Sequence, residues 1–134
     1  MSVIRADGER VMSETTAVDI GRHLERHLQA HGGDGLIYYG DLISLFVDLP
    51  PFDGNWSAHP LCKLFDELDR EDASLARPFR TALVVRRKDN LPGPGFFKAL
   101  ADYTDKGKPI TREKDRVAVH AEQLSMLVEH YRHL

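Results

Sequence analysis

The segment that most constrains how this chain can fold is residues 77–100, RPFRTALVVRRKDNLPGPGFFKAL. The apolar and β-branched residues at 79–85 predict a buried central strand, and the polar residues at 86–90 predict a turn after it. A Pro-Gly-Pro-Gly sequence then restricts the backbone before a helix predicted over residues 96–103. We expect these prolines and glycines to form a rigid turn that seats the aromatic start of that helix in the core.

Helical spacing and stop signals define three elements before this segment. Thr16 and Asp19 resemble a capping box, and the apolar residues that follow at helical spacing predict a helix over residues 17–31. Residues 36–38 are apolar and bracketed by glycines, which predicts a brief edge strand. A second short helix is predicted to begin at Asp41 and to end before the Pro-Pro pair that follows.

Two longer helices complete the predicted set. The third helix begins near Ser57, buries one apolar face and has an outer face that becomes strongly acidic toward its end. The acidic residues are Asp66, Glu67, Asp69, Glu71 and Asp72. Thr111 is a candidate cap for the last helix, whose long apolar stripe includes Leu127 and Tyr131 and reaches Leu134.

The order of these elements predicts an α+β fold in which helices dominate. Two helices, a strand and a polar turn in succession are typical of a winged-helix domain, here with a long C-terminal helix; a small helical bundle with one hairpin is the alternative. A chain of 134 residues fits one domain, which we place at residues 16–134. Residues 1–15 have no hydrophobic period and are predicted to be a loose lead-in. Met12 is a candidate natural start, which N-terminal sequencing would test.

Charge, hydropathy and cysteine content narrow the class of protein. The formal net charge of -3 gives no overall attraction to nucleic acid or to an acidic membrane surface, so any such attraction must come from a local patch. No apolar run approaches the roughly 18 residues of a membrane span, and the first residues lack the apolar core of a secretory signal. The single cysteine, Cys62, excludes an internal disulfide and is predicted to be a core thiol. Together these features predict a cytoplasmic protein that does not associate with membranes.

A family resemblance rests on two short segments. They are Tyr39-Gly40-Asp41-Leu42 and, after an intervening helix, Leu83-Val84-Val85-Arg86 with a polar turn and glycines. This arrangement resembles the winged-helix DNA-binding domain of the alkylguanine-DNA alkyltransferase and alkyltransferase-like family. The resemblance covers roughly the middle half of the chain, and it implies a winged-helix fold and binding to DNA.

The same resemblance argues against repair chemistry. It places Thr81 where the alkyl-accepting cysteine of the family would lie, and Ala82 and Leu83 at the positions of its His-Arg pair. Alkyl transfer needs an activated thiolate, which threonine cannot supply. We therefore expect a non-enzymatic protein with no catalytic residues, no metal and no cofactor.

Basic residues around the predicted strand are the candidate nucleic-acid contacts. The turn after the strand contributes Arg86, Arg87 and Lys88, and the predicted strand itself contributes Arg80. The start of the third helix contributes Ser57, His59 and Lys63. Such side chains could contact phosphates if they share a face. The acidic end of the third helix opposes this hypothesis if it lies on that face, and a solvated surface that balances nearby acids is the plainer interpretation.

A protein-interaction or regulatory module is the closest alternative. Trp56 would then be an aromatic anchor for a partner, although the favoured role for Trp56 is a lid that folds onto the core. Leu127 and Tyr131 would contact a partner or a second copy of the chain through the last helix. A metal- or anion-binding enzyme is a minor alternative. It would use the anion-binding end of the helix that follows the Pro-Gly turn or the histidine-rich helices. The histidines concerned are His23, His27, His31, His120, His130 and His133.

Overall fold

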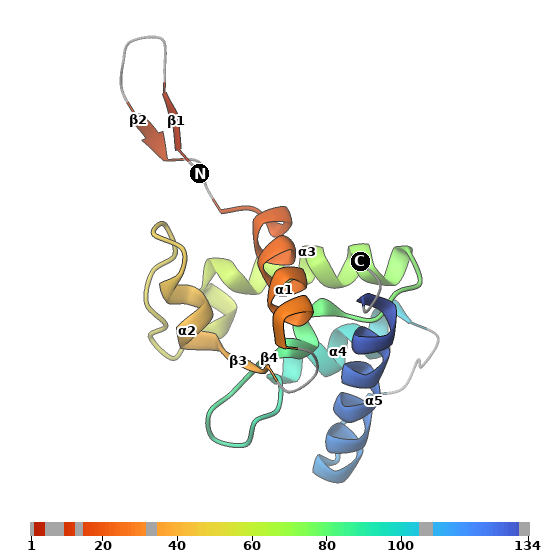
Figure 1. Ribbon diagram of the computed structural model, residues 1–134. Helices are drawn as coiled ribbons and strands as arrows, with labels where there is room; N and C mark the ends of the chain where they lie inside the picture. Colours follow the sequence, from red (N-terminus) through yellow and green to blue (C-terminus); the bar gives the residue numbers. More distant parts are fainter. Residues whose placement is uncertain (1, 5–9, 13–14, 32–34, 105–108, 132–134) are drawn as a thin grey trace.

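The computed structural model describes residues 2–4, 10–12, 15–31, 35–104 and 109–131 (Figure 1). It is a helix-dominated α+β fold. The strands are β1 Ser2–Ile4, β2 Arg10–Met12, β3 Ile37–Tyr38 and β4 Val84–Val85. The helices are α1 Ala17–His31, α2 Tyr39–Ser44, α3 Pro60–Ser74, α4 Pro94–Tyr103 and α5 Glu113–Tyr131, with short 3-10 helices η2 Trp56–Ala58 and η3 Arg80–Leu83.

The first helix, α1, has the bounds that its capping box predicts. The Thr16 backbone N–H donates to the Asp19 carboxylate at 2.9 Å, and the Asp19 N–H donates back to the Thr16 hydroxyl at 3.2 Å. The hydrogen bond from the Thr16 backbone lowers the pKa of Asp19. Ile20, Leu24 and Leu28 are buried along one face, so the apolar spacing also identified the buried side correctly.

The sheet of the main body consists of β3 and β4. They pair in parallel, with Ile37 opposite Val84 and Tyr38 opposite Val85. A tight hairpin cannot connect parallel strands, and the chain between these two strands contains α2 and α3. The predicted edge strand is therefore confirmed, and it brings the start of α2 beside the end of β4.

The predicted central strand over residues 79–85 is mostly wrong. Arg80–Leu83 form the 3-10 helix η3, and only Val84–Val85 form a strand. The physical reason is that η3 is fixed by α3: the Arg80 N–H donates to Asp72 at 3.0 Å, and the Thr81 hydroxyl donates to Asp69 at 2.6 Å. The apolar composition of this segment predicted its burial correctly, because the residues of both η3 and β4 are buried.

The acidic end of α3 is also arranged differently from the prediction. Asp69 and Asp72 are buried, whereas Glu67 and Glu71 are exposed. Asp72 is fully buried and forms ion pairs with Arg77 at 2.5 Å and Arg80 at 3.2 Å. The two aspartates therefore hold the segment that follows α3, and they are not part of an acidic outer face.

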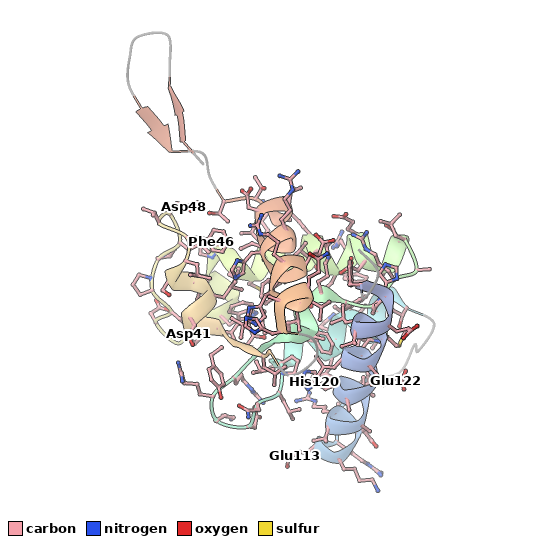
Figure 2. All side chains as sticks on the ribbon, in the orientation of Figure 1. Asp41, Phe46, Asp48, Glu113, His120 and Glu122 are labelled. Carbon is pink, nitrogen blue, oxygen red and sulfur yellow. The ribbon has the colours of Figure 1, made fainter. Side chains whose placement is uncertain are left out.

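The last helix, α5, covers η3 from another side. The His120 ring hydrogen-bonds to the Ala82 carbonyl at 2.8 Å, and Gln123 accepts a hydrogen bond from the Phe79 N–H at 3.1 Å. In Figure 2, His120 lies on the side of α5 that faces the rest of the fold. η3 also contacts α1 and α3, so these three helices meet around it.

The partner contact predicted on α5 is wrong for its two named residues. Leu127 is 0% exposed and Tyr131 is 3% exposed, because both pack into the core that surrounds η3. Side chains with so little exposed surface offer almost nothing for a second copy of the chain to contact. Leu134 and His133 lie outside the described residues.

The segment after β4 contains the polar turn and the Pro-Gly turn. The Asn90 N–H donates to the Arg86 carbonyl at 2.8 Å, and the Arg86 N–H donates to the Leu91 carbonyl at 2.9 Å. Phe96 and Phe97 at the start of α4 are buried, which confirms the structural role predicted for the prolines and glycines. Residues 86–93 form no strand, and the winged-helix assignment stays a prediction.

The segment predicted to be a loose lead-in contains a pair of short strands. β1 pairs antiparallel with β2, with Ser2 opposite Met12 and Ile4 opposite Arg10. Figure 1 shows these two strands standing apart from the helices. The main body begins where the Thr15 backbone N–H donates to Asp48 at 2.6 Å. Of the helices in the described part of the chain, none has both the length and the apolar character needed to cross a membrane.

Candidate functional site

An apolar groove lies between α2, the loop that follows it and the turn after β4. Its volume is about 750 Å³, and we call it the α2 groove. It is lined by Tyr38, Tyr39, Gly40, Ile43, Ser44, Phe46, Val47, Leu49, Pro51, Phe52, Val85, Arg86, Arg87 and Lys88. Among the described residues that line it, three are cationic and none is a carboxylate. Figure 2 shows Asp41, Phe46 and Asp48 on the α2 side of the molecule.

The loop after α2 exposes large apolar side chains at this groove. Val47 is 87% exposed and Phe52 is 47% exposed, whereas Leu49 between them is buried. Backbone hydrogen bonds from Phe46 to Ile43 and from Leu49 to Phe46 hold the loop in tight turns, and the prolines that follow prevent a longer helix. The apolar side chains are therefore presented on a constrained backbone.

The turn after β4 supplies the charge at the groove. Arg86 forms an ion pair with Asp89, and Arg87 pairs with Asp41 at 3.1 Å while its guanidinium lies 4.3 Å from the centre of the Tyr38 ring. Lys88 is exposed and has no ion pair with any described residue. The turn therefore carries three cations, two of which are already partly neutralised by neighbouring carboxylates.

Two of the predicted nucleic-acid contacts are wrong because they are buried. Arg80 is 5% exposed and is held by Asp72, so it cannot reach a phosphate. His59 is 6% exposed, and its ring caps α3 by accepting a hydrogen bond from the Leu61 N–H at 3.1 Å. The other ring nitrogen hydrogen-bonds to the Pro50 carbonyl at 2.7 Å. A histidine at this position is a helix cap that the sequence pattern did not identify.

The remaining predicted contacts fall on two different surfaces. Arg86, Arg87 and Lys88 line the α2 groove, whereas Ser57 and Lys63 line a second cavity. Figure 1 shows the last turn of α3 on the opposite side of the molecule from the turn after β4, which contains Arg86, Arg87 and Lys88. Asp66 and Asp69 of α3, however, line the same cavity as Ser57 and Lys63. The structure therefore divides the predicted basic surface into two parts, and acidic residues of α3 lie beside only the part that contains Lys63.

The second cavity, which we call the α3–α4 cavity, has a volume of about 560 Å³. Side chains of α3, α4, η2 and η3 line it, together with Tyr39 and two glycines of the Pro-Gly turn, Gly93 and Gly95. The Tyr39 hydroxyl accepts a hydrogen bond from the Gly93 N–H at 3.0 Å. Burial raises the pKa of Tyr39 to about 12, so this hydroxyl stays protonated and anchors the turn.

Trp56 and Cys62 lie at the same cavity. Trp56 is half-buried; its ring is parallel to that of His59, and it packs against Phe65 with ring centres 5.6 Å apart. This packing favours the lid role over an exposed anchor. Cys62, predicted to be a core thiol, is only half-buried and lies at the cavity wall. Burial and the nearby Asp66 raise the pKa of the Cys62 thiol, so it is not activated as a nucleophile.

The histidines of α1 form a row of neighbouring rings. The ring centres of His23 and His27 lie 6.3 Å apart, and those of His27 and His31 lie 4.5 Å apart. The described residues include no group of three or more histidine, cysteine or acidic side chains placed to hold a metal ion. His120 is occupied with the Ala82 carbonyl and does not join the row.

Comparison with known proteins adds no family. No family model, no curated protein and no solved structure matches the chain. The function is therefore inferred from the geometry of the α2 groove and the α3–α4 cavity.

Proposed function

We propose that this protein is a protein-interaction domain whose α2 groove binds a short apolar peptide segment that carries an acidic side chain. The observation behind this proposal is the combination of exposed apolar residues and cations in a groove without a lining carboxylate. Exposed apolar patches bordered by polar residues are typical of protein-binding surfaces.

The apolar floor would supply most of the affinity. Covering a valine or phenylalanine side chain contributes about 1.5–3 kcal/mol, and both Val47 and Phe52 leave large apolar surfaces exposed to water. The constrained loop also reduces the entropy that binding would cost, because the apolar residues are already positioned. A partner residue of aliphatic or aromatic type fits this surface.

The cationic side of the groove would supply orientation and selectivity. Lys88 is the exposed cation without a carboxylate partner among the described residues, so it is the natural contact for an acidic side chain of the partner. Charges at the rim of an interface change association rates and partner choice more than affinity. An acidic residue beside apolar residues is therefore the expected signature of the bound segment.

Selection from a displayed library of random peptides would test this proposal. We expect selected peptides to combine apolar residues with Asp or Glu and to bind Val47→Asp about tenfold or more weakly, because the change places a charge on the apolar floor. The matched control is Val117→Asp, which makes the same substitution at a valine that is 51% exposed on α5 and does not line the groove.

The charge contact has its own variant. Lys88→Glu should shift the selected peptides from acidic to basic residues while their apolar positions stay the same. Peptides that bind wild type and Val47→Asp equally, or a selection with no enrichment, would contradict the proposal.

Nucleic-acid binding by a winged-helix-like domain is the second candidate. It is favoured by one observation: Arg87 lies over Tyr38 in a groove that also contains Phe52, an arrangement of cations and aromatic rings suited to phosphates and stacked bases. Fluorescence anisotropy of labelled duplex and single-stranded DNA at low and moderate salt would test it. The variant with Arg86, Arg87 and Lys88 changed to Glu should abolish salt-sensitive binding, and no binding at low salt would eliminate this candidate.

A further inference from the structure

The α3–α4 cavity contains a buried carboxyl group without a cationic partner. Asp69 is 3% exposed and lines this cavity, and one of its oxygens accepts a hydrogen bond from the Thr81 hydroxyl at 2.6 Å. Within the described part of the chain, Asp69 forms no ion pair. It differs in this respect from Asp72, one helical turn later, which pairs with two arginines.

Of the cations at or near this cavity, Arg80 and Lys98 have other partners, whereas Lys63 is exposed and forms no ion pair within the described part of the chain. Arg80 pairs with Asp72 and approaches Glu71 and Glu25, each at 3.7 Å. Lys98, at the edge of the cavity, pairs with Asp102. Asp66, another lining carboxylate, pairs with Arg70 and accepts a hydrogen bond from Tyr103. Asp69 is therefore the buried acid of this cavity that has no cationic partner within the described part of the chain.

An unbalanced buried carboxylate is costly. Removing a charge from water without a partner costs several kcal/mol, and proteins avoid the cost by neutralising the group or by pairing it. Burial and the neighbouring Asp72 and Asp66 raise the pKa of Asp69 well above its ordinary value. A cation that entered the cavity would pair with the ionised form of Asp69 and displace its proton, so the cavity offers a cation a carboxylate with no other charged partner.

Aromatic rings line the same cavity. The ring centres of Tyr39 and Trp56 lie 5.0 Å apart, and those of Trp56 and Phe65 lie 5.6 Å apart. All three side chains belong to the cavity lining. Aromatic faces attract organic cations and pack against flat apolar groups, and the volume of about 560 Å³ is within the range of small-molecule sites.

We propose that the α3–α4 cavity binds a small organic cation with a flat apolar portion, of the aryl-amidinium or aryl-ammonium class. The cationic group contacts the Asp69 carboxylate, and the flat portion packs against the rings of Trp56, Tyr39 and Phe65. This site shares Tyr39 with the lining of the α2 groove, but it does not depend on the function proposed for that groove.

Benzamidine is the probe, and benzamide is the neutral compound of nearly the same shape. Trp56 is the single tryptophan of the chain and lines the cavity, so its fluorescence reports occupancy. We expect benzamidine to bind at least about tenfold more tightly than benzamide, because the amidinium forms charge-assisted hydrogen bonds with a buried carboxylate. Asp69→Asn should remove this preference. Asp115→Asn, which changes an exposed aspartate on α5, should retain it.

A second variant and a second measurement locate the site. Cys62→Phe places a ring at the cavity wall without changing Asp69, and we expect it to block benzamidine. In the wild-type protein, benzamidine should shift the amide NMR signals of Gly93 and Gly95, which line the cavity, more than those of Gly40, which does not. A cooperative thermal melt of each variant would show that a loss of benzamidine binding is not caused by unfolding.

Equal binding of the two compounds, or binding of neither, would overturn the proposal. A preference for benzamidine that survives Asp69→Asn would overturn it as well, and so would fluorescence quenching without shifts at Gly93 and Gly95.

Discussion

Two arginine–aspartate pairs flank β4 and differ in almost everything except their residue types. Arg80 pairs with Asp72, and the side chains are 6% and 0% exposed. Arg87 pairs with Asp41, and the side chains are 68% and 62% exposed. The first pair fixes η3 against α3, whereas the second lies at the edge of the α2 groove. In the sequence both arginines belong to one basic stretch, so the comparison shows that burial decides whether such a charge is structural or available for binding.

The buried pair also accounts for a nearby glycine. A Cβ added to Gly21 on α1 would lie 2.3 Å from a terminal nitrogen of Arg80. Glycine therefore leaves the space in which the guanidinium reaches Asp72 and approaches Glu25 on the same helix. The exposed pair has no comparable constraint from neighbouring helices.

The largest expected effect on stability is the loss of Asp72, the aspartate of the buried pair. Asp72→Ala should lower the free energy of unfolding by about 3–5 kcal/mol, because it leaves the buried guanidinium of Arg80 without its nearest carboxylate. Urea denaturation followed by circular dichroism would measure this change, with Asp41→Ala as the control. Similar losses in the two variants would show that burial does not distinguish the pairs.

Asp69 sharpens the comparison because it is buried like Asp72 but unpaired. Its pKa is raised in the folded state, so the folded protein keeps a proton that the unfolded chain has released above the ordinary aspartate pKa. The wild type should therefore lose stability relative to Asp69→Asn as the pH rises from about 4, by up to about 1.4 kcal/mol per pH unit, until the folded pKa is passed.

Unfolding free energies of the wild type and Asp69→Asn measured across that pH range would test this expectation. Wild-type stability that stays constant or rises relative to Asp69→Asn as the pH rises would show that Asp69 is paired in solution.

The capping box of α1 should give an intermediate effect. Thr16 is exposed, but its hydroxyl accepts a hydrogen bond from the Asp19 backbone N–H, which has no partner earlier in the helix. Thr16→Ala should cost about 1 kcal/mol in a thermal or urea melt. Thr16→Ser, which keeps the hydroxyl that accepts this hydrogen bond, is the control. Equal losses in the two variants would show that the capping hydrogen bond does not contribute.

The smallest effect is expected for the exposed pair. Asp41→Ala should change the unfolding free energy by less than about 1 kcal/mol, because water and salt screen an exposed ion pair. A double-mutant cycle with Arg87→Ala would isolate the coupling between the two residues. Coupling as large as that of the buried pair would contradict the distinction between them.

Local signals predicted the parts of the fold that depend on near neighbours in the chain. The Thr16–Asp19 capping box and the apolar spacing gave α1 its correct bounds. The glycines around β3 gave the short strand, and the Pro-Gly turn gave the start of α4 to within two residues. Each of these signals acts within a few residues of the element it defines, so the rest of the fold was not needed.

Other features were missed because their cause is distant in the sequence. Asp69 and Asp72 continue the helical spacing of Phe65 and Leu68, a signal that could have placed them on the buried face of α3. The composition of residues 79–85 predicted burial correctly but not its form, because α3 supplies the hydrogen bonds that make η3. The apolar groove beside Val47 also depends on contacts that no local pattern encodes.

The sequence alone determined the helices, the short strand and the dominance of helix over sheet, since these follow from periodicity, capping and backbone restriction. The tertiary structure decided which charges are buried and which are free: Arg80 and Arg87 have the same chemistry, and only their distance from α1 and α3 separates them. It also decided that β3 pairs with β4, which brings the α2 groove together. Solvent access and long-range pairing depend on the whole chain, and both candidate binding sites follow from them.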